Sequence, residues 1–325
     1  LPLSPDTLAN LDQLGYTEMT AIQAASLPLA LAGKDLIAQA STGSGKTAAF
    51  GLPVVEKLTA NFHAVQALVM CPTRELADQV TTEIRRLARA TANIKVVTLC
   101  GGVALRGQEQ SLQHGAHVVV GTPGRILDHL TRGNLRLDSV KTLVLDEADR
   151  MLDMGFYDDM KQLIAQCPAQ RQTLMFSATY PEGIAKLSAQ FMRDPQTVKV
   201  QTVHAADKIR QVFYEVREDE RLHAVSLLLN HFRPESTLAF CNTKQQCREL
   251  LAVLQAQGFD ALALYGELEQ RERDQVLVQF ANRSCSVLVA TDVAARGLDV
   301  SQLNAVINVD VTPDAELHIH RIGRT

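Results

Sequence analysis

Short apolar segments rich in β-branched residues alternate along the chain with longer amphipathic stretches. In the first half the apolar segments include DLIAQA, HVVVGTP and TLVLDEAD, and in the second half they include TLAFCN and SVLVATD. Continuous apolar strands that alternate with helices are typical of a parallel sheet with helices on both faces, because such strands are buried on both sides. The pattern therefore predicts an α/β architecture in both halves.

The length of 325 residues predicts two domains, since single domains cluster near roughly 100–200 residues. A polar stretch without a clear period, VQTVHAADKIRQ, separates the two halves. We therefore predict an N-terminal domain over residues 1–203, a linker over 204–210 and a C-terminal domain over 211–325.

Composition indicates a soluble globular protein and says little about its ligands. No apolar run reaches the roughly 18–20 residues that a membrane span needs, so we expect a cytoplasmic protein. None of the six cysteines forms a CxxC pair, which favours buried free thiols over a zinc site or disulfides. The net charge of −4 gives no sign of nucleic-acid binding, because phosphate neutralisation needs Lys and Arg, so any such surface must be a local groove.

The segment ASTGSGKT, residues 40–47, carries the strongest chemical signal. It follows the strand DLIAQ and precedes an apolar helical stretch, which is the context that a phosphate-binding loop requires. Gly43 and Gly45 let backbone N–H groups converge on phosphate oxygens, Lys46 is expected to reach the β- and γ-phosphates, and the Thr47 hydroxyl is expected to bind Mg²⁺. The first position is Ala40, where the strict pattern has Gly. The predicted nucleotide-binding residues of the loop are Ser41, Thr42, Gly43, Ser44, Gly45, Lys46 and Thr47.

A phosphate loop needs an acidic metal partner at the end of a neighbouring strand, and TLVLDEAD supplies one. Asp146 and Glu147 directly follow the apolar run. Ligands of parallel sheets bind at the carboxyl ends of the strands, so both carboxylates are expected to face the phosphates. We expect Asp146 to hold Mg²⁺ through water and Glu147 to orient and deprotonate the attacking water.

Together with ASTGSGKT, the string DEAD at residues 146–149 resembles the DEAD-box family of ATP-dependent RNA helicases. The other family motifs follow in order over nearly the whole chain: GYTEMTAIQ, PTRELADQ, LCGG, TPGR, SAT, AFCNT, VATDVAARGLD and HRIGRT. The stretches LEQRERDQ and CPTRELADQV are most similar to a bacterial subgroup, the DbpA-type helicases. The resemblance implies two tandem RecA-like domains, each a parallel sheet flanked by helices, with ATP and RNA bound across the cleft between them.

The resemblance assigns nucleotide roles outside the phosphate loop. Gln23 would read the adenine edge through its amide, Asp299 would hold the ribose, and Arg324 would be a finger on the γ-phosphate, worth about 10³–10⁵ in rate. Tyr16 lies either near the base pocket or in the core. Ala21 stands where the family usually has Pro.

The resemblance also implies residues that connect the nucleotide to RNA. Ser177 and Thr179 would couple the two sites through hydrogen bonds toward Asp149. His320 and Arg321 resemble the family's contacts between domains, and Arg321 is also counted among the nucleotide-binding residues.

RNA contacts are implied at loop tips that carry small residues and hydroxyls rather than many basic side chains. Glycines let backbone amides approach phosphates, and hydroxyls and amides can bond phosphates or the 2′-OH that distinguishes RNA from DNA. The implied residues are Thr73, Arg74, Gly101, Gly102, Thr122, Gly124, Arg125, Asn242, Thr243, Gln270, Arg273, Thr291, Arg296 and Gly297.

The predicted function is ATP-dependent, local unwinding of short RNA duplexes by a monomer. A DbpA-like parent would act on 23S ribosomal RNA in large-subunit assembly. Two alternatives stay open, namely an ATP-gated RNA clamp without productive unwinding and a DNA-directed helicase. The family's second domain usually continues beyond HRIGRT, so we expect a C-terminally truncated second domain and poor turnover of this fragment.

Overall fold

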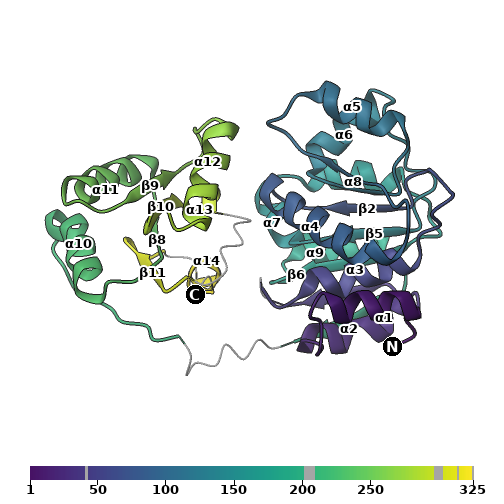
Figure 1. The fold of residues 1–325 in the computed structure, drawn as a ribbon, viewed down its shortest axis with the longest axis horizontal. Coiled ribbons are helices and arrows are strands. Elements are labelled where there is room, and N and C mark those ends of the chain that lie inside the picture. Colours follow the sequence, from purple (N-terminus) through teal and green to yellow (C-terminus); the bar gives the residue numbers. More distant parts are fainter. Residues whose placement is uncertain (41–42, 201–208, 296–302, 313–314, 324–325) are drawn as a thin grey trace. The chain divides into compact units, whose positions relative to one another are not determined.

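The computed structural model describes residues 1–325 except 41–42, 201–208, 296–302, 313–314 and 324–325. The chain divides into two compact units, Leu1–Thr202 and Val203–Thr325. Each unit contains one parallel sheet flanked by helices, which confirms the predicted α/β class (Figure 1). The predicted linker over 204–210 lies mostly outside the described residues. Within the described ranges, no helix is long and apolar enough to cross a membrane.

The sheet of the first unit has seven strands in the order β3-β4-β2-β5-β6-β1-β7, and every neighbouring pair is parallel. All its strands therefore end at one edge, where β1, β6 and β5 are neighbours. The strands are β1 (Leu36–Gln39), β2 (Ala67–Met70), β3 (Val96–Leu99), β4 (Val118–Gly121), β5 (Thr142–Leu145), β6 (Gln172–Ser177) and β7 (Gln196–Lys199).

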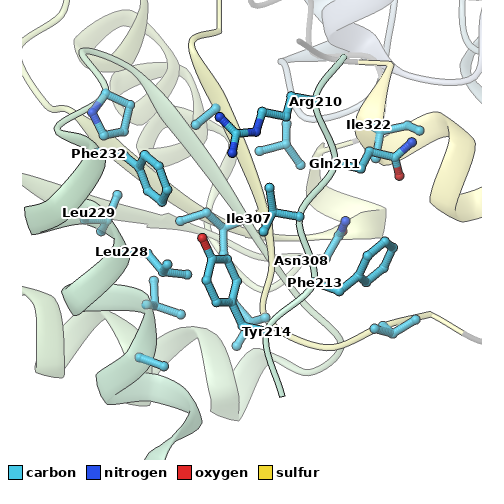
Figure 2. Close-up of a pocket in the computed structure, with 18 of the residues that line it drawn as sticks. Arg210, Gln211, Phe213, Tyr214, Leu228, Leu229, Phe232, Ile307, Asn308 and Ile322 are labelled. Atoms are coloured by element: carbon cyan, nitrogen blue, oxygen red, sulfur yellow. The ribbon is translucent and has the colours of Figure 1, made fainter. Parts of the chain in front are cut away.

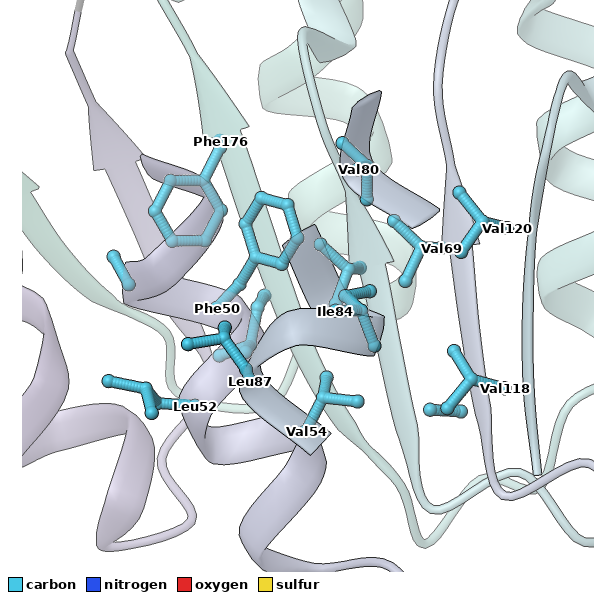
Figure 3. Close-up of a cluster of buried hydrophobic side chains, with 14 of the residues drawn as sticks. Phe50, Leu52, Val54, Val69, Val80, Ile84, Leu87, Val118, Val120 and Phe176 are labelled. Atoms are coloured by element: carbon cyan, nitrogen blue, oxygen red, sulfur yellow. The ribbon is translucent and has the colours of Figure 1, made fainter. Parts of the chain in front are cut away.

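Helices cover both faces of this sheet, because side chains alternate between two apolar clusters along each strand. One cluster joins the sheet to α2, α3 and α4, and the other joins it to α6, α8 and α9. Figure 3 shows the first cluster, in which the rings of Phe50 and Phe176 lie 5.3 Å apart. The helices are α1 (Pro5–Gln13), α2 (Ala21–Leu31), α3 (Lys46–Glu56), α4 (Arg74–Leu87), α5 (Leu105–Gln113), α6 (Pro123–Thr131), α7 (Ala148–Asp153), α8 (Tyr157–Ala165) and α9 (Glu182–Phe191), with a 3₁₀ turn η1 (Ala88–Ala90).

The second unit has a parallel sheet with the described strand order β11-β8-β10-β9. One face packs on α10 and α11 and the other on α12 and α13. All six cysteines of the chain are buried free thiols, as the sequence predicted. The elements are η2 (Glu218–Glu220), α10 (Arg221–Phe232), β8 (Thr237–Cys241), α11 (Lys244–Ala256), β9 (Ala261–Leu264), α12 (Gln270–Ala281), β10 (Val287–Thr291), α13 (Asp292–Ala295), β11 (Ala305–Asn308) and α14 (Ala315–Ile322).

A groove of about 1210 Å³ runs along β11, the outermost described strand on its side of the second sheet. Its opposite wall is the segment 209–216, and α10 contributes Leu228, Leu229 and Phe232 (Figure 2). Phe213 is 74% exposed and Tyr214 is 50% exposed. Exposed apolar side chains therefore lie beside the outermost described strand of this sheet, and proteins normally cover such an outer strand.

Gly121 at the end of β4 allows β3 and β4 to lie close together. A Cβ at this position would lie 2.1 Å from the carbonyl oxygen of Leu99 on β3. We expect Gly121→Ala to lower the free energy of unfolding of the first unit by about 2–4 kcal/mol, since two strand backbones must separate. Gly107→Ala on α5 is the control, because nothing lies within 4 Å of its Cβ, and it should be neutral or stabilising by up to about 1 kcal/mol. Calorimetric unfolding that finds the two variants equally stable would contradict this packing.

Candidate functional site

The glycines of the phosphate loop adopt backbone conformations that other residues avoid. Gly43 has φ +78° and Gly45 has φ +90°, and α3 begins immediately afterwards at Lys46. Lys46 is buried, and its Nζ donates a hydrogen bond to the Ala40 carbonyl at 3.3 Å. Lys46, at the start of a helix, thus bonds back to the residue that begins the loop, and a helix start is suited to anions. Ser41 and Thr42 lie outside the described residues.

Gln23 lies against this loop and caps α2. Its Oε1 accepts a hydrogen bond from Thr20 N at 2.9 Å, and its Nε2 donates to the Gly45 carbonyl at 3.1 Å. A Cβ on Gly45 would lie 2.7 Å from Gln23 Nε2, so this contact also explains the glycine. These bonds use the amide oxygen and one amide hydrogen, and adenine recognition through Gln23 would have to share or replace them.

Tyr16 has the core role, which was one of the two predicted for it. Its hydroxyl donates to Glu83 on α4, and its ring packs on the first apolar cluster. Burial, with the neighbouring Glu83 carboxylate, raises the pKa of Tyr16 to about 12.

Two buried carboxyl groups follow β5, as predicted. Asp146 is 2% exposed and Glu147 is 3% exposed. The pKa of Asp146 is raised from its ordinary value of 3.8 to about 6, mainly by burial; nearby Lys46 lowers this pKa and nearby Glu147 raises it. An ionised Asp146 is therefore costly in the protein alone, and a bound cation would relieve that cost.

Glu147 has a strained backbone, and its side chain has an ion-pair partner that the sequence analysis missed. Its backbone is left-handed, with φ 50° and ψ 51°, which typically costs a non-glycine residue about 1–3 kcal/mol. Arg150 Nη1 lies 3.2 Å from Glu147 Oε2, and both side chains are buried. The helical i,i+3 spacing was the available signal, but it could not show that the pair is buried.

The carboxylate of Asp149 joins the start of α7 to the end of β6. Its Oδ2 accepts hydrogen bonds from Ala178 N at 3.1 Å, Thr179 N at 2.8 Å and Thr179 Oγ1 at 3.0 Å. In return the backbone N–H of Asp149 donates to Ser177 Oγ at 3.2 Å. The hydrogen bonds expected of Ser177 and Thr179 toward Asp149 are therefore present.

The implied RNA-contact residues of the first unit all follow strands β2, β3 and β4 at the same sheet edge. Thr73 caps α4, where its Oγ1 accepts from Leu76 N at 3.3 Å, and Arg74 pairs with Asp78 at 3.4 Å. Gly101 and Gly102 are exposed after β3. The remaining members, after β4, are Thr122, Gly124 and Arg125.

The implied RNA-contact residues of the second unit also lie at strand ends and helix starts. Thr243 caps α11, where its Oγ1 accepts from Gln246 N at 3.2 Å, and Thr291 ends β10. On α12, Gln270 donates to Asp274 at 2.9 Å, and Arg273 Nη2 donates to the Ala294 carbonyl at 3.3 Å. Arg296, Gly297, Asp299 and Arg324 lie outside the described residues, as does the side chain of His320.

Arg321 is buried, and its guanidinium is fully used inside the second unit. Nε and Nη2 donate to the two carboxylate oxygens of Asp292 at 2.7 and 2.6 Å, and Nη2 also donates to Asn242 Oδ1 at 2.9 Å. Nη1 donates to the Asp310 carbonyl at 2.9 Å and to Asn308 Oδ1 at 3.3 Å. A guanidinium has five N–H donors, so none is left for a phosphate. A nucleotide contact of Arg321 would therefore have to share or replace one of these bonds, one of which goes to Asn242.

Comparison with known proteins identifies the family. The DEAD/DEAH box helicase model matches residues 20–187, and the helicase conserved C-terminal domain model matches residues 220–325. The chain belongs to the DEAD-box family of ATP-dependent RNA helicases. The predicted family is thus confirmed.

Among curated helicases, the chain is 54% identical to ATP-dependent RNA helicase DbpA of Escherichia coli over 99% of this chain and 71% of that protein. It is 45% identical to CshA of Geobacillus kaustophilus over 100% of this chain and 70% of that protein. For CshA of Streptococcus pneumoniae serotype 4 the identity is also 45%, and the chain spans 62% of that protein.

Two solved structures have a similar fold. Saccharomyces cerevisiae Dbp5 bound to RNA and ADP BeF3 gives a TM-score of 0.89 at 30% identity, covering 100% of this chain and 84% of that one. A DEAD box protein from Methanococcus jannaschii gives a TM-score of 0.61 at 41% identity, covering 100% of this chain and 88% of that one.

The buried Asp146 should make this helicase less stable above about pH 6. Its folded-state pKa is raised, so the stability that its neutral form provides is present below pH 3.8 and is lost as pH rises to about 6. Asp146→Asn should therefore raise the free energy of unfolding of the nucleotide-free protein by about 1–3 kcal/mol at pH 7.5. The gain should shrink as pH falls and vanish near pH 4.

Denaturant unfolding of both proteins between about pH 4 and 8 measures this difference. Asp138→Asn is the control, because that carboxylate is 58% exposed and should give no gain that grows with pH. If Asp146→Asn is no more stable than the parent at pH 7.5, the ionised Asp146 carboxylate does not destabilise the folded protein.

Proposed function

We propose that the first unit hydrolyses ATP at the ends of β1 and β5 and transmits the state of that site to RNA through β6. The observation that carries this proposal is the Asp149 carboxylate, which binds Ala178 and Thr179 after β6, while Asp146 and Glu147 lie three and two residues before it. A structural change around the nucleotide would then alter the hydrogen bonds between Asp149 and the end of β6.

The residues of the site fit Mg²⁺ as the metal partner of ATP. Mg²⁺ prefers oxygen ligands and keeps several waters, so one carboxylate, one hydroxyl and the phosphates suffice. Asp146 and Thr47 would hold the ion, which supplies charge neutralisation on the phosphates when bound.

Glu147 is the proposed general base of the hydrolysis step. Its carboxylate would orient the attacking water and take its proton, and the ion pair with Arg150 keeps that carboxylate in a fixed place. Lys46 would leave its bond to the Ala40 carbonyl to meet the β- and γ-phosphates. The predicted contributions of Asp299 and Arg324 from the second unit remain part of the proposal.

RNA is the nucleic acid that we propose at the loop tips after β2, β3 and β4. Those tips offer hydroxyls, glycine backbone and few cations, which suits contacts to phosphates and 2′-OH groups. DbpA and CshA are named as ATP-dependent RNA helicases, and Dbp5 was solved with RNA. Tight ATP and RNA binding would then depend on each other, and local unwinding of short duplexes is the outcome that we propose for this coupling.

The resemblance to DbpA-type helicases extends the proposal to a cellular role. A cytoplasmic monomer that acts on large-subunit ribosomal RNA would take part in ribosome assembly. The 54% identity to DbpA supports this assignment.

Glu147→Gln tests the proposed chemistry. The variant should bind ATP and RNA within about threefold of the parent but lose roughly 10²–10⁴-fold in hydrolysis rate, because a neutral amide cannot take the proton of water. Single-turnover hydrolysis at saturating RNA measures the rate, and fluorescent nucleotide and RNA measure binding. Glu182→Gln, at a side chain that is 83% exposed, should hydrolyse ATP normally. Unchanged turnover in Glu147→Gln would remove Glu147 from the reaction.

Two further assays on the same protein preparation distinguish RNA unwinding from the two alternatives, a DNA-directed helicase and an RNA clamp without unwinding. Stimulation of hydrolysis by single-stranded RNA but not by DNA of the same sequence is expected, and equal stimulation would favour the DNA-directed helicase. Release of a short duplex strand by ATP is also expected. Tight RNA binding without such release would favour the clamp.

A further inference from the structure

The proposed RNA-contact loop between β3 and α5 needs an external support. Gly101, Gly102, Val103 and Ala104 are all exposed, and Gly102 is left-handed with φ +77°. Two adjacent glycines give the backbone wide conformational freedom, which costs entropy whenever a ligand must order it. A loop that binds RNA well should therefore be held in place beforehand.

Gln108 on α5 anchors both ends of this loop. Its side chain is buried, and its Nε2 donates to the Cys100 carbonyl at 2.8 Å, immediately before Gly101. Its Oε1 accepts from Arg125 Nη1 at 3.2 Å, and the same Nη1 donates to the Val103 carbonyl at 3.2 Å. The first end of the loop is thus held by Gln108 directly, and the second end is held through Arg125.

His129 on α6 fixes the orientation of this amide. His129 Nε2 lies 2.9 Å from Gln108 Oε1, and because the Gln108 nitrogen already donates to a carbonyl, the histidine must donate here. Burial and nearby Arg125 lower the pKa of His129, so the ring is neutral with its hydrogen on Nε2. Turning the amide over would place its NH₂ group against two donors and its oxygen against a carbonyl.

The same network joins α5 to α6, which lie next to each other in the first unit (Figure 1). The start of α6 carries the second group of implied RNA contacts, Thr122, Gly124 and Arg125. The bonds above use Nη1 of Arg125, and its Nη2 is engaged by none of them. Nε of Arg125 lies 4.0 Å from Asp128 Oδ2, so Nη2 is the donor that we expect to reach a phosphate.

We propose that Gln108 is a positioning residue for RNA, which holds the loop Gly101–Gly102 at a fixed distance from Thr122–Arg125. The inference rests on the proposed RNA function of these loops. The signal in the sequence was a glutamine six residues after LCGG, which carries no information about its three partners.

Gln108→Met tests the proposal, because methionine keeps the length and burial of the side chain and removes its hydrogen bonds. The dissociation constant for single-stranded RNA should rise about tenfold, as expected for lost buried hydrogen bonds. The RNA concentration at half-maximal ATPase stimulation should rise equally. The kcat at saturating RNA and the affinity for nucleotide without RNA should change less than about twofold.

Gln110→Met is the matched control, since Gln110 is exposed on the same helix and should leave RNA affinity unchanged. Amide hydrogen exchange of residues 101–104 in the RNA-free protein provides a second measurement and should be faster in Gln108→Met alone. Unchanged RNA affinity with unchanged exchange would overturn the inference, and so would equal losses of RNA affinity, nucleotide affinity and thermal stability. Failure of the unaltered protein to bind RNA would instead overturn the proposed function, while the exchange result would still report on the loop.

Discussion

The hydrogen bonds between the Asp149 carboxylate and the end of β6 are the interaction on which the account of this helicase depends. A buried carboxylate is stable only when it is well paired, and Asp149 accepts three hydrogen bonds from Ala178 and Thr179. Asp146 and Glu147 precede it at the end of β5, so the groups proposed for nucleotide chemistry and the turn after β6 form one connected unit. The two strands are neighbours in the sheet, which keeps their ends in register.

Several groups at this sheet edge are held in costly states. Asp146 is buried with a raised pKa, Glu147 has left-handed backbone, and the buried lysine of the phosphate loop bonds a carbonyl of its own loop. Strain of this kind persists only when the surrounding structure enforces it, and it typically occurs at functional sites. The apolar clusters on both faces of the seven-stranded sheet provide that enforcement.

Much of the fold and of the local chemistry could be predicted from sequence, because these depend on short-range pattern. Strand, loop, Lys46 and helix are contiguous, and so are β5 and its two carboxyl groups. Contacts that depend on strand order could not be predicted from spacing, and those of Ser177 and Thr179 with Asp149 were implied only by the family resemblance. The five bonds of Arg321 come from the ends of β8, β10 and β11, whose adjacency no spacing in the sequence reveals. Arg150 and Gln108 were missed because their importance arises from burial and from partners on other elements.

Reciprocal binding of nucleotide and RNA tests the central claim most directly. The measurement is the dissociation constant of a nonhydrolysable ATP analogue with and without saturating single-stranded RNA, for the parent and for Thr179→Val, which loses the hydroxyl bond to Asp149. RNA should tighten analogue binding by about 5–150-fold in the parent, the usual range for coupled sites, and much less in the variant. Each ligand alone should bind both proteins equally. Undiminished coupling in Thr179→Val would contradict transmission through Asp149 and the end of β6.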